Sequence, residues 1–430
     1  MALTAPGARR ALSRRSASLW RPATLLFWTL SRLVLLYSVV VLGHKCDQVF
    51  WTYGHDIAAL HLMPYRDFGV EYPPLAVALF AIPGGARDWP HYAGWFAVMM
   101  LAANLLTLAF VRYAAETLDL WADGWRAAFC YAVLAFATTA VLNKYDVAPG
   151  LLTLVAIVAL IRGWDRAAWV ALAAAVLFKG YAVVLAPFFL LYRYRVRRAM
   201  PWWQGPLAGA LATAVVLLPV IAASGPAFAR TLLFHANRGL EIESIYASVV
   251  LMAHNIAHLS VWVTAGKAVT SRDVHSALNG PLETVAPVAL AGCLAGAYAA
   301  AWVRLWREAT PEALVLLSMA AITAFTITFK ALPSHYLLWL IPLAAVALGC
   351  PASRTTGAAS AVLCAVGLSA IVPLVWLPLR HFDPVAVAIM VGRNLALIAV
   401  FLLLIRRSLT SGRQERPEEA DMSASSGRSS

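Results

Sequence analysis

The feature of this sequence that most constrains its fold is a succession of long apolar runs along nearly the whole chain. Most of the runs have about 15–22 residues, close to the roughly 20 that an α-helix needs to cross a bilayer, and several are shorter. With 61% hydrophobic and 13% charged residues, the chain is too apolar for a soluble domain. The runs lack the alternation of a membrane β-barrel, and no segment has a convincing strand pattern. The sequence therefore predicts an all-α polytopic membrane protein.

The apolar runs also predict the domain organisation. Residues 1–22 form a basic N-terminal segment, residues 23–410 a transmembrane domain, and residues 411–430 a polar tail that we expect to be disordered. The two longest loops cover about residues 44–91 and 223–284. We expect about twelve spans, at residues 23–43, 92–111, 127–142, 147–161, 167–178, 181–192, 206–222, 285–303, 312–329, 336–349, 357–378 and 385–405.

The positive charge follows this topology. Of the 34 Lys and Arg residues, 21 fall on the side of the N-terminus, 11 on the opposite side and two, Arg32 and Arg393, within spans. Positive residues concentrate in cytoplasmic loops, so we expect both termini inside the cell and both long loops outside. The net charge of +13 then needs no nucleic-acid partner. The five cysteines have no disulfide or metal spacing, and His254 and His258 lack a third ligand, so no metal is expected.

Three local features complete the expected fold. Apolar residues at helical spacing between residues 48 and 63 predict a juxtamembrane helix in the first long loop. Lys179 and Gly180 interrupt two short apolar runs, which suggests a helical hairpin with its tip outside. In the second long loop, Ile245–Ala265 is amphipathic, and lying at the interface and inserting into the membrane both remain open.

Polar residues gather at the outer ends of the predicted spans, where charge near the membrane is costly and usually functional. A carboxylate there can take a proton from a hydroxyl, and cations can hold a phosphate. Structural alternatives are a helix cap for Asp47, pairing of Lys144 with Asp146, and an interfacial role for Arg238. The candidate residues are Asp47, Tyr72, Lys144, Asp146, Lys179, His235, Arg238, Glu243, Lys330 and His335.

Several of these residues lie in segments that resemble a known family. In order along the chain the segments are CDQVFW, PYRDFGVEYPPLA, NKYDVAPGLLTL, FKGYAVVLAPFFLLYR, HANRGLEIES and PSHYLLWLIPLA. Over about residues 20–345 the chain resembles the GT-C superfamily of polyprenyl-phosphate-dependent glycosyltransferases. It is most similar to the actinobacterial mannosyltransferases of glycosyltransferase family 87.

The resemblance implies a GT-C-like helical bundle and roles for particular residues. The family's essential first-loop aspartate corresponds to Asp47, which would be the general base. Its basic residue corresponds to Arg238, with Glu243 as the acidic member of the same segment. The histidine near the donor phosphate corresponds to His335. The first loop has no DxD pair, which argues against a divalent metal, and no cofactor is expected.

We therefore expect an inverting transfer of a sugar, mannose by resemblance, from a polyprenyl-phosphate donor. The acceptor would be a glycolipid or cell-envelope glycan on the outer face of the cytoplasmic membrane, with membrane lipids around the bundle. A transporter or lipid flippase is the rival from another class, and it predicts midplane charges and an internal repeat. A non-catalytic scaffold of the same fold and an arabinosyl or glucosyl donor also remain open.

Overall fold

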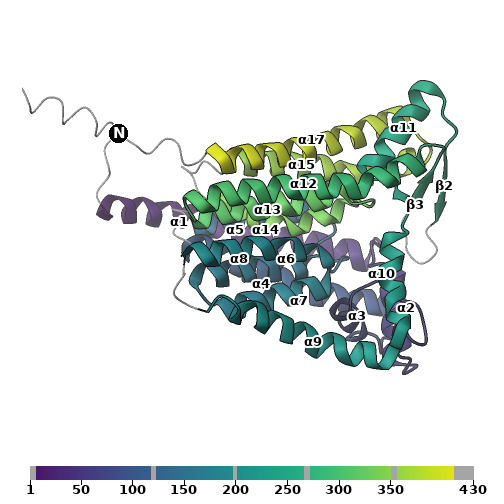
Figure 1. Cartoon of the computed structure of the whole chain (residues 1–430), viewed down its shortest axis with the longest axis horizontal. Coiled ribbons are helices and arrows are strands. Elements are labelled where there is room, and N and C mark those ends of the chain that lie inside the picture. The colour runs from purple at the N-terminus through teal and green to yellow at the C-terminus, as the bar shows by residue number, and fades with distance from the viewer. Residues whose placement is uncertain (1–5, 118–122, 197–200, 266–271, 350–355, 411–430) are drawn as a thin grey trace, which may run out of the picture.

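The computed structural model describes residues 6–117, 123–196, 201–265, 272–349 and 356–410. Figure 1 shows an elongated bundle in which the long helices run roughly side by side. The predicted helical fold is confirmed, with one small sheet added. The elements are α1 (Pro6–Val40), α2 (Gln48–Ala58), α3 (Pro74–Ala81), α4 (Trp89–Thr117), α5 (Gly124–Ala137), α6 (Val147–Arg162), α7 (Asp165–Phe178), η1 (Gly180–Leu185), α8 (Ala186–Val196), α9 (Gln204–Ser224), η2 (Gly225–Phe228), α10 (Ala229–Ala236), β1 (Leu240–Glu241), α11 (Ile245–Ala257), β2 (Trp262–Ala265), β3 (Arg272–His275), α12 (Asn279–Arg307), α13 (Pro311–Thr328), η3 (Ser334–Trp339), α14 (Ile341–Leu348), α15 (Thr356–Ile371), η4 (Val372–Val375), α16 (Trp376–Arg380) and α17 (Pro384–Thr410).

Each predicted apolar run coincides mostly with helical structure, but the count of twelve spans is not confirmed. Some of the runs form shorter elements, namely α5, α6, α7, η1–α8 and η3–α14. Among the described residues, seven helical segments are long and apolar enough to cross a membrane: Leu19–Val40, Trp89–Thr117, Gln204–His235, Asn279–Arg307, Pro311–Thr328, Ala359–Arg380 and Pro384–Thr410.

The two long loops lie at one end of the bundle. Figure 1 shows α2 and α3 of the first loop at the same end of the bundle as α10, α11 and the sheet of the second, whereas α1 begins and α17 ends at the opposite end. The first loop contains the predicted juxtamembrane helix as α2. Pro73 is extended and Pro74 begins α3, a position where the missing N–H of proline costs nothing.

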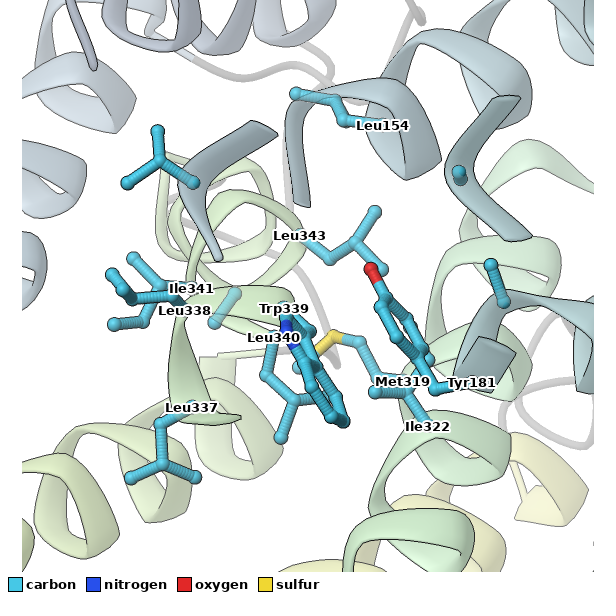
Figure 2. Packing of buried hydrophobic residues seen from close by; sticks show 14 of the residues in the cluster. Leu154, Tyr181, Met319, Ile322, Leu337, Leu338, Trp339, Leu340, Ile341 and Leu343 are labelled. Carbon is cyan, nitrogen blue, oxygen red and sulfur yellow. The ribbon is translucent and has the colours of Figure 1, made fainter. Parts of the chain in front are cut away.

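The centre of the bundle is α13, because 83% of its residues are buried. In the most apolar part of Gln204–His235, which contains α9, only 11% of the residues are buried. Next to it, the rings of Tyr181 and Trp339 stack with centroids 4.1 Å apart (Figure 2). Gly150 of α6 lets η3 approach, since a Cβ there would lie 2.7 Å from the carbonyl oxygen of Leu338. This close packing fixes the position of η3, which also contains His335.

The second loop differs from its prediction. The hydroxyl of Ser244 caps α11 by accepting a hydrogen bond from the Ala247 N–H. The helix ends at Ala257 because His258 adopts a left-handed conformation. The prediction of one amphipathic stretch over Ile245–Ala265 is therefore wrong beyond Ala257, since Trp262–Ala265 forms β2. The central strand β3 pairs antiparallel with both β1 and β2.

Candidate active site

A cavity of about 970 Å³ lies among the segments that meet at the loop end of the bundle. Its walls come from α1, the turn between α5 and α6, the junction of α7 and η1, η3 and the segment before α11. Both apolar and ionisable residues line the cavity. The ionisable residues are His44, Asp47, Glu71, Lys144, Asp146, Lys179, His235, Arg238, Glu241, Glu243 and His335, with Tyr72, Tyr145, Tyr181 and Tyr336.

The cavity brings together nine of the ten candidate residues from widely separated parts of the sequence. Lys330 is the exception within the described chain, because its side chain does not line the cavity. Its backbone carbonyl instead accepts a hydrogen bond of 2.9 Å from the Glu241 N–H. The nine that line the cavity are Asp47, Tyr72, Lys144, Asp146, Lys179, His235, Arg238, Glu243 and His335.

Asp47 occupies the N-cap position of α2, but its side chain makes no capping hydrogen bond. Its carboxylate instead accepts a hydrogen bond of 2.5 Å from the Lys144 ammonium group. The two side chains are 17% and 20% exposed, so the pair is accessible from the cavity without being fully solvated. The helix-cap alternative for Asp47 and the pairing of Lys144 with Asp146 are therefore both wrong.

Asp146 has a different cation. The Lys179 ammonium group donates to its Oδ1 at 2.6 Å, and the indole N–H of Trp339 donates to the same oxygen at 2.8 Å. Lys179 also lies over three rings, those of Tyr145, Tyr336 and Trp339, at 4.4–5.2 Å from their centroids. Such contacts stabilise a desolvated cation. Lys179 is thus held by an acid and an aromatic cage.

Arg238 follows α10 and is the third cation of the cavity wall. Within the described part of the chain, it has no carboxylate within ion-pair distance, in contrast to Lys144 and Lys179. Its charge acts on Glu71 and Glu241 by lowering their pKa values against the effect of burial. Arg238 is therefore the cation of this wall that is best placed to take an anionic ligand.

Burial and the nearby charges shift the pKa values of other ionisable groups around the cavity. Burial, and then the nearby cations Lys144, Lys179 and Arg238, hold the pKa of His335 well below its usual value. His335 is therefore neutral at physiological pH. Burial raises the pKa values of Glu71 and Glu243, and burial together with repulsion from Glu243 raises the pKa of Glu241.

Sequence reasoning missed Glu71, Glu241 and Arg393 as parts of this region. Glu71 lines the cavity and accepts a hydrogen bond of 2.5 Å from the Tyr53 hydroxyl, while its Oε1 has no partner among the described residues. Its position directly before Tyr72 was the available signal. Arg393 lies outside the cavity wall, and its partners Leu332 and Glu243 are more than 60 residues away in sequence. No local pattern could have indicated them.

Among the described residues, no group of three or more His, Cys, Asp or Glu side chains is arranged to hold a metal ion.

Comparison with solved structures found the crystal structure of ArnT from Cupriavidus metallidurans bound to undecaprenyl phosphate, at 14% identity and a TM-score of 0.46. That alignment covers 90% of this chain and 77% of ArnT. The apo oligosaccharyltransferase of Archaeoglobus fulgidus matches at 13% identity and a TM-score of 0.40, over 90% of this chain and 56% of that one.

Comparison with curated proteins found no match. The family description "Glycosyltransferase family 87" matches residues 71–329, which is more than half of the chain. The matched range includes Tyr72, Lys144, Lys179 and Arg238, while Asp47 and His335 lie outside it. The chain is thus a multi-pass membrane glycosyltransferase that belongs to glycosyltransferase family 87.

Proposed function

We propose that this protein transfers a sugar from a polyprenyl-phosphate donor to a glycolipid or cell-envelope glycan. The transfer inverts the anomeric carbon and takes place on the outer face of the cytoplasmic membrane. The observation that carries the proposal is that Asp47 and Arg238 line one cavity whose wall also includes many apolar residues. These three parts correspond to a base, a phosphate anchor and a place for a lipid.

Asp47 acts as the general base. A hydroxyl of the acceptor attacks the anomeric carbon, the bond from that carbon to the phosphate oxygen breaks, and Asp47 takes the hydroxyl proton. A single displacement of this kind inverts the anomeric configuration. The Lys144 ammonium group fixes the orientation of the Asp47 carboxylate, because it binds one of its two oxygens. The second oxygen is then available to the acceptor.

Arg238 binds the donor phosphate. The leaving group keeps the bonding electrons, so negative charge grows on the phosphate during the reaction. A guanidinium group presents several donors in a fixed plane and suits a phosphate better than a point charge does. Because Arg238 has no carboxylate partner within the described residues, its charge is available for this stabilisation. Neutral His335 adds a hydrogen bond.

The apolar wall accommodates the lipid part of the donor. It is formed by α1, α5, α13 and η4 through Val34, Phe136, Phe325, Phe329 and Leu374, among others. Val34 and Leu374 are 56% and 80% exposed, so these two apolar side chains of the wall are not enclosed by the bundle. The proposed entry for the lipid is therefore beside α1 and η4. A polyprenyl chain can extend from there into the bilayer while its phosphate stays at Arg238.

Mannose is the proposed sugar, because the sequence resembles the mannosyltransferases of this family. The test is transfer from radiolabelled polyprenyl-phosphate mannose in membranes that contain the wild type, Asp47→Asn or Asp56→Asn at equal expression. Asp56 is the control, since it lies on the same helix α2 but does not line the cavity among the described residues. We expect transfer by the wild type and Asp56→Asn, loss of transfer with Asp47→Asn, and no effect of a chelator.

Other outcomes separate the alternatives. Full activity of Asp47→Asn would remove Asp47 as the base, although the family assignment would stand. Transfer from a glucosyl or arabinosyl lipid, with none from the mannosyl lipid, would correct the sugar. A protein that moves labelled lipid across vesicle membranes without any sugar transfer would favour the transporter reading over the proposal.

A further inference from the structure

Arg393 is a fully buried arginine in the middle of α17, outside the wall of the cavity. Its guanidinium group connects two segments of the cavity wall. One Nη donates to the carbonyl oxygen of Leu332 at 3.0 Å, and the other donates to the carbonyl oxygen of Glu243 at 2.9 Å. The second Nη also lies 3.5 Å from a carboxylate oxygen of Glu243.

The same two segments are also bound to each other. The Glu243 carboxylate accepts hydrogen bonds from the backbone N–H and the hydroxyl of Ser334, at 3.0 and 2.8 Å. The Glu241 carboxylate accepts from the Leu332 N–H at 3.2 Å. Ser334 directly precedes His335, and Glu241 follows Arg238 by three residues. Arg393 therefore binds both of the connected segments, one of which contains Arg238 and the other His335, the two proposed phosphate-binding side chains.

We propose that Arg393 is a positioning residue for phosphate recognition, acting through the backbone of these two segments. It holds the segment from Arg238 to Glu243 against the segment from Leu332 to His335, so that Arg238 and His335 point at one phosphate. This inference rests on the proposed function. It explains why a charged group is buried within a membrane-spanning helix, where charge is costly and usually functional.

The geometry explains why arginine is required. Two carbonyl oxygens on different segments are bridged by the two ends of one planar group, each end donating to one oxygen. A lysine keeps the positive charge near Glu243 but has a single ammonium group on a flexible stem. It cannot hold both carbonyls in the same arrangement. Arg393→Lys therefore tests position separately from charge.

Arg32 provides a matched control. It is likewise buried in a candidate span, α1, and donates to the Asn104 side chain at 2.8 Å and to the Ala132 carbonyl at 3.2 Å. These partners belong to α4 and α5, and Arg32 does not line the cavity within the described chain. Arg32→Lys should reduce thermal stability as much as Arg393→Lys does, without an effect on the reaction.

The experiment measures kcat, the KM for polyprenyl-phosphate mannose and the thermal midpoint of the purified full chain in lipid nanodiscs. The variants are Arg393→Lys, Arg238→Ala, their double mutant and the corresponding pair with Arg32→Lys. We expect Arg393→Lys to lower kcat by about 10–100-fold, as small misplacements of binding groups do, with a smaller change in KM. In the Arg238→Ala background, Arg393→Lys should cost much less than it does alone.

The outcomes separate this inference from the proposed function. An unchanged kcat in Arg393→Lys, or a loss that multiplies fully with that of Arg238→Ala, would overturn the positioning role. Arg238→Ala with wild-type activity would instead overturn the phosphate anchor of the proposed function. If Arg393→Lys does not accumulate, Asn394→Ala replaces it, because Asn394 donates to the same Glu243 carbonyl at 3.2 Å. The same pattern is expected at smaller amplitude.

Discussion

The ammonium group of Lys144 binds the carboxylate of Asp47, although 97 residues separate them in sequence. Lys144 lies on the turn between α5 and α6, and Asp47 is the residue directly before α2. The contact therefore joins the first long loop to the body of the bundle at the cavity. It also makes the proposed base dependent on a residue from another part of the chain.

Replacing Lys144 by methionine should lower kcat by about tenfold or more, because the Asp47 carboxylate loses its orientation and its counter-charge. The control is Lys45→Met, which removes a cation two residues from Asp47 that lies over the Trp89 ring. We expect Lys45→Met to keep near wild-type activity. The rate of sugar transfer at saturating donor gives kcat for both variants. An equal loss of kcat in Lys144→Met and Lys45→Met would show that the positive charge of the region matters and the pairing of Lys144 with Asp47 does not.

Arg238→Ala should lower kcat/KM for the lipid-linked donor by about 10²–10³-fold, the usual loss when one group that stabilises developing charge is removed. Arg238→Lys should recover part of this loss, since it restores the charge without the planar donors. Arg230 on α10 is exposed and does not line the cavity among the described residues, so Arg230→Ala is the control. Initial rates over a range of donor concentrations give kcat/KM for each variant. An equal loss of kcat/KM in Arg238→Ala and Arg230→Ala would contradict this expectation.

Gly150→Ala should destabilise the protein by about 1–3 kcal/mol, because the new Cβ would lie 2.7 Å from the Leu338 carbonyl oxygen and force α6 and η3 apart. Gly296 in α12 has open space where a Cβ would be added, so Gly296→Ala should be neutral or slightly stabilising. Thermal unfolding in detergent compares the two. A Gly150→Ala protein as stable as the wild type would show that the helices can adjust without cost.

The lowered pKa of His335 predicts a pH dependence of stability. Above its ordinary value of 6.5, both folded and unfolded states leave it neutral. Below that pH the unfolded chain binds a proton that the folded protein resists, so the free energy of unfolding falls as pH falls. The slope is at most about 1.4 kcal/mol per pH unit.

His335→Gln should flatten this dependence between pH 6.5 and 5. The raised pKa values of Glu71, Glu241 and Glu243 act in the opposite direction above pH 4.5, and they are present in both proteins. The difference between the two stability profiles, measured by thermal unfolding in detergent, therefore isolates His335. Parallel profiles would show that His335 is not kept neutral by the fold.

Sequence reasoning predicted the helical class and the gathering of polar side chains at one end of the bundle, because apolar runs fix where the chain crosses and where it turns. It could not predict which charges pair. Lys144 is two residues from Asp146, yet it binds Asp47, and Lys179 takes Asp146 instead. These choices depend on how distant helices pack, and no spacing along the chain records them.

The small sheet and the end of α11 were missed for a different reason. The strands have only two to four residues, too short to show an alternating pattern, and they are held by pairing with each other. The left-handed His258 that ends α11 is also an uncommon conformation for a residue other than glycine. Lys330 was chosen for its charge, but what the structure uses toward Glu241 is its backbone carbonyl.

Val34 and Leu374 line the cavity and are largely exposed, and we propose that the lipid-linked donor enters beside them. Such a donor would diffuse in two dimensions within one leaflet and would not pass through water. Its effective concentration is then its mole fraction in the membrane. Adding inert phospholipid at a fixed amount of donor and enzyme should slow transfer by surface dilution, even though the concentration of donor per volume of suspension stays the same.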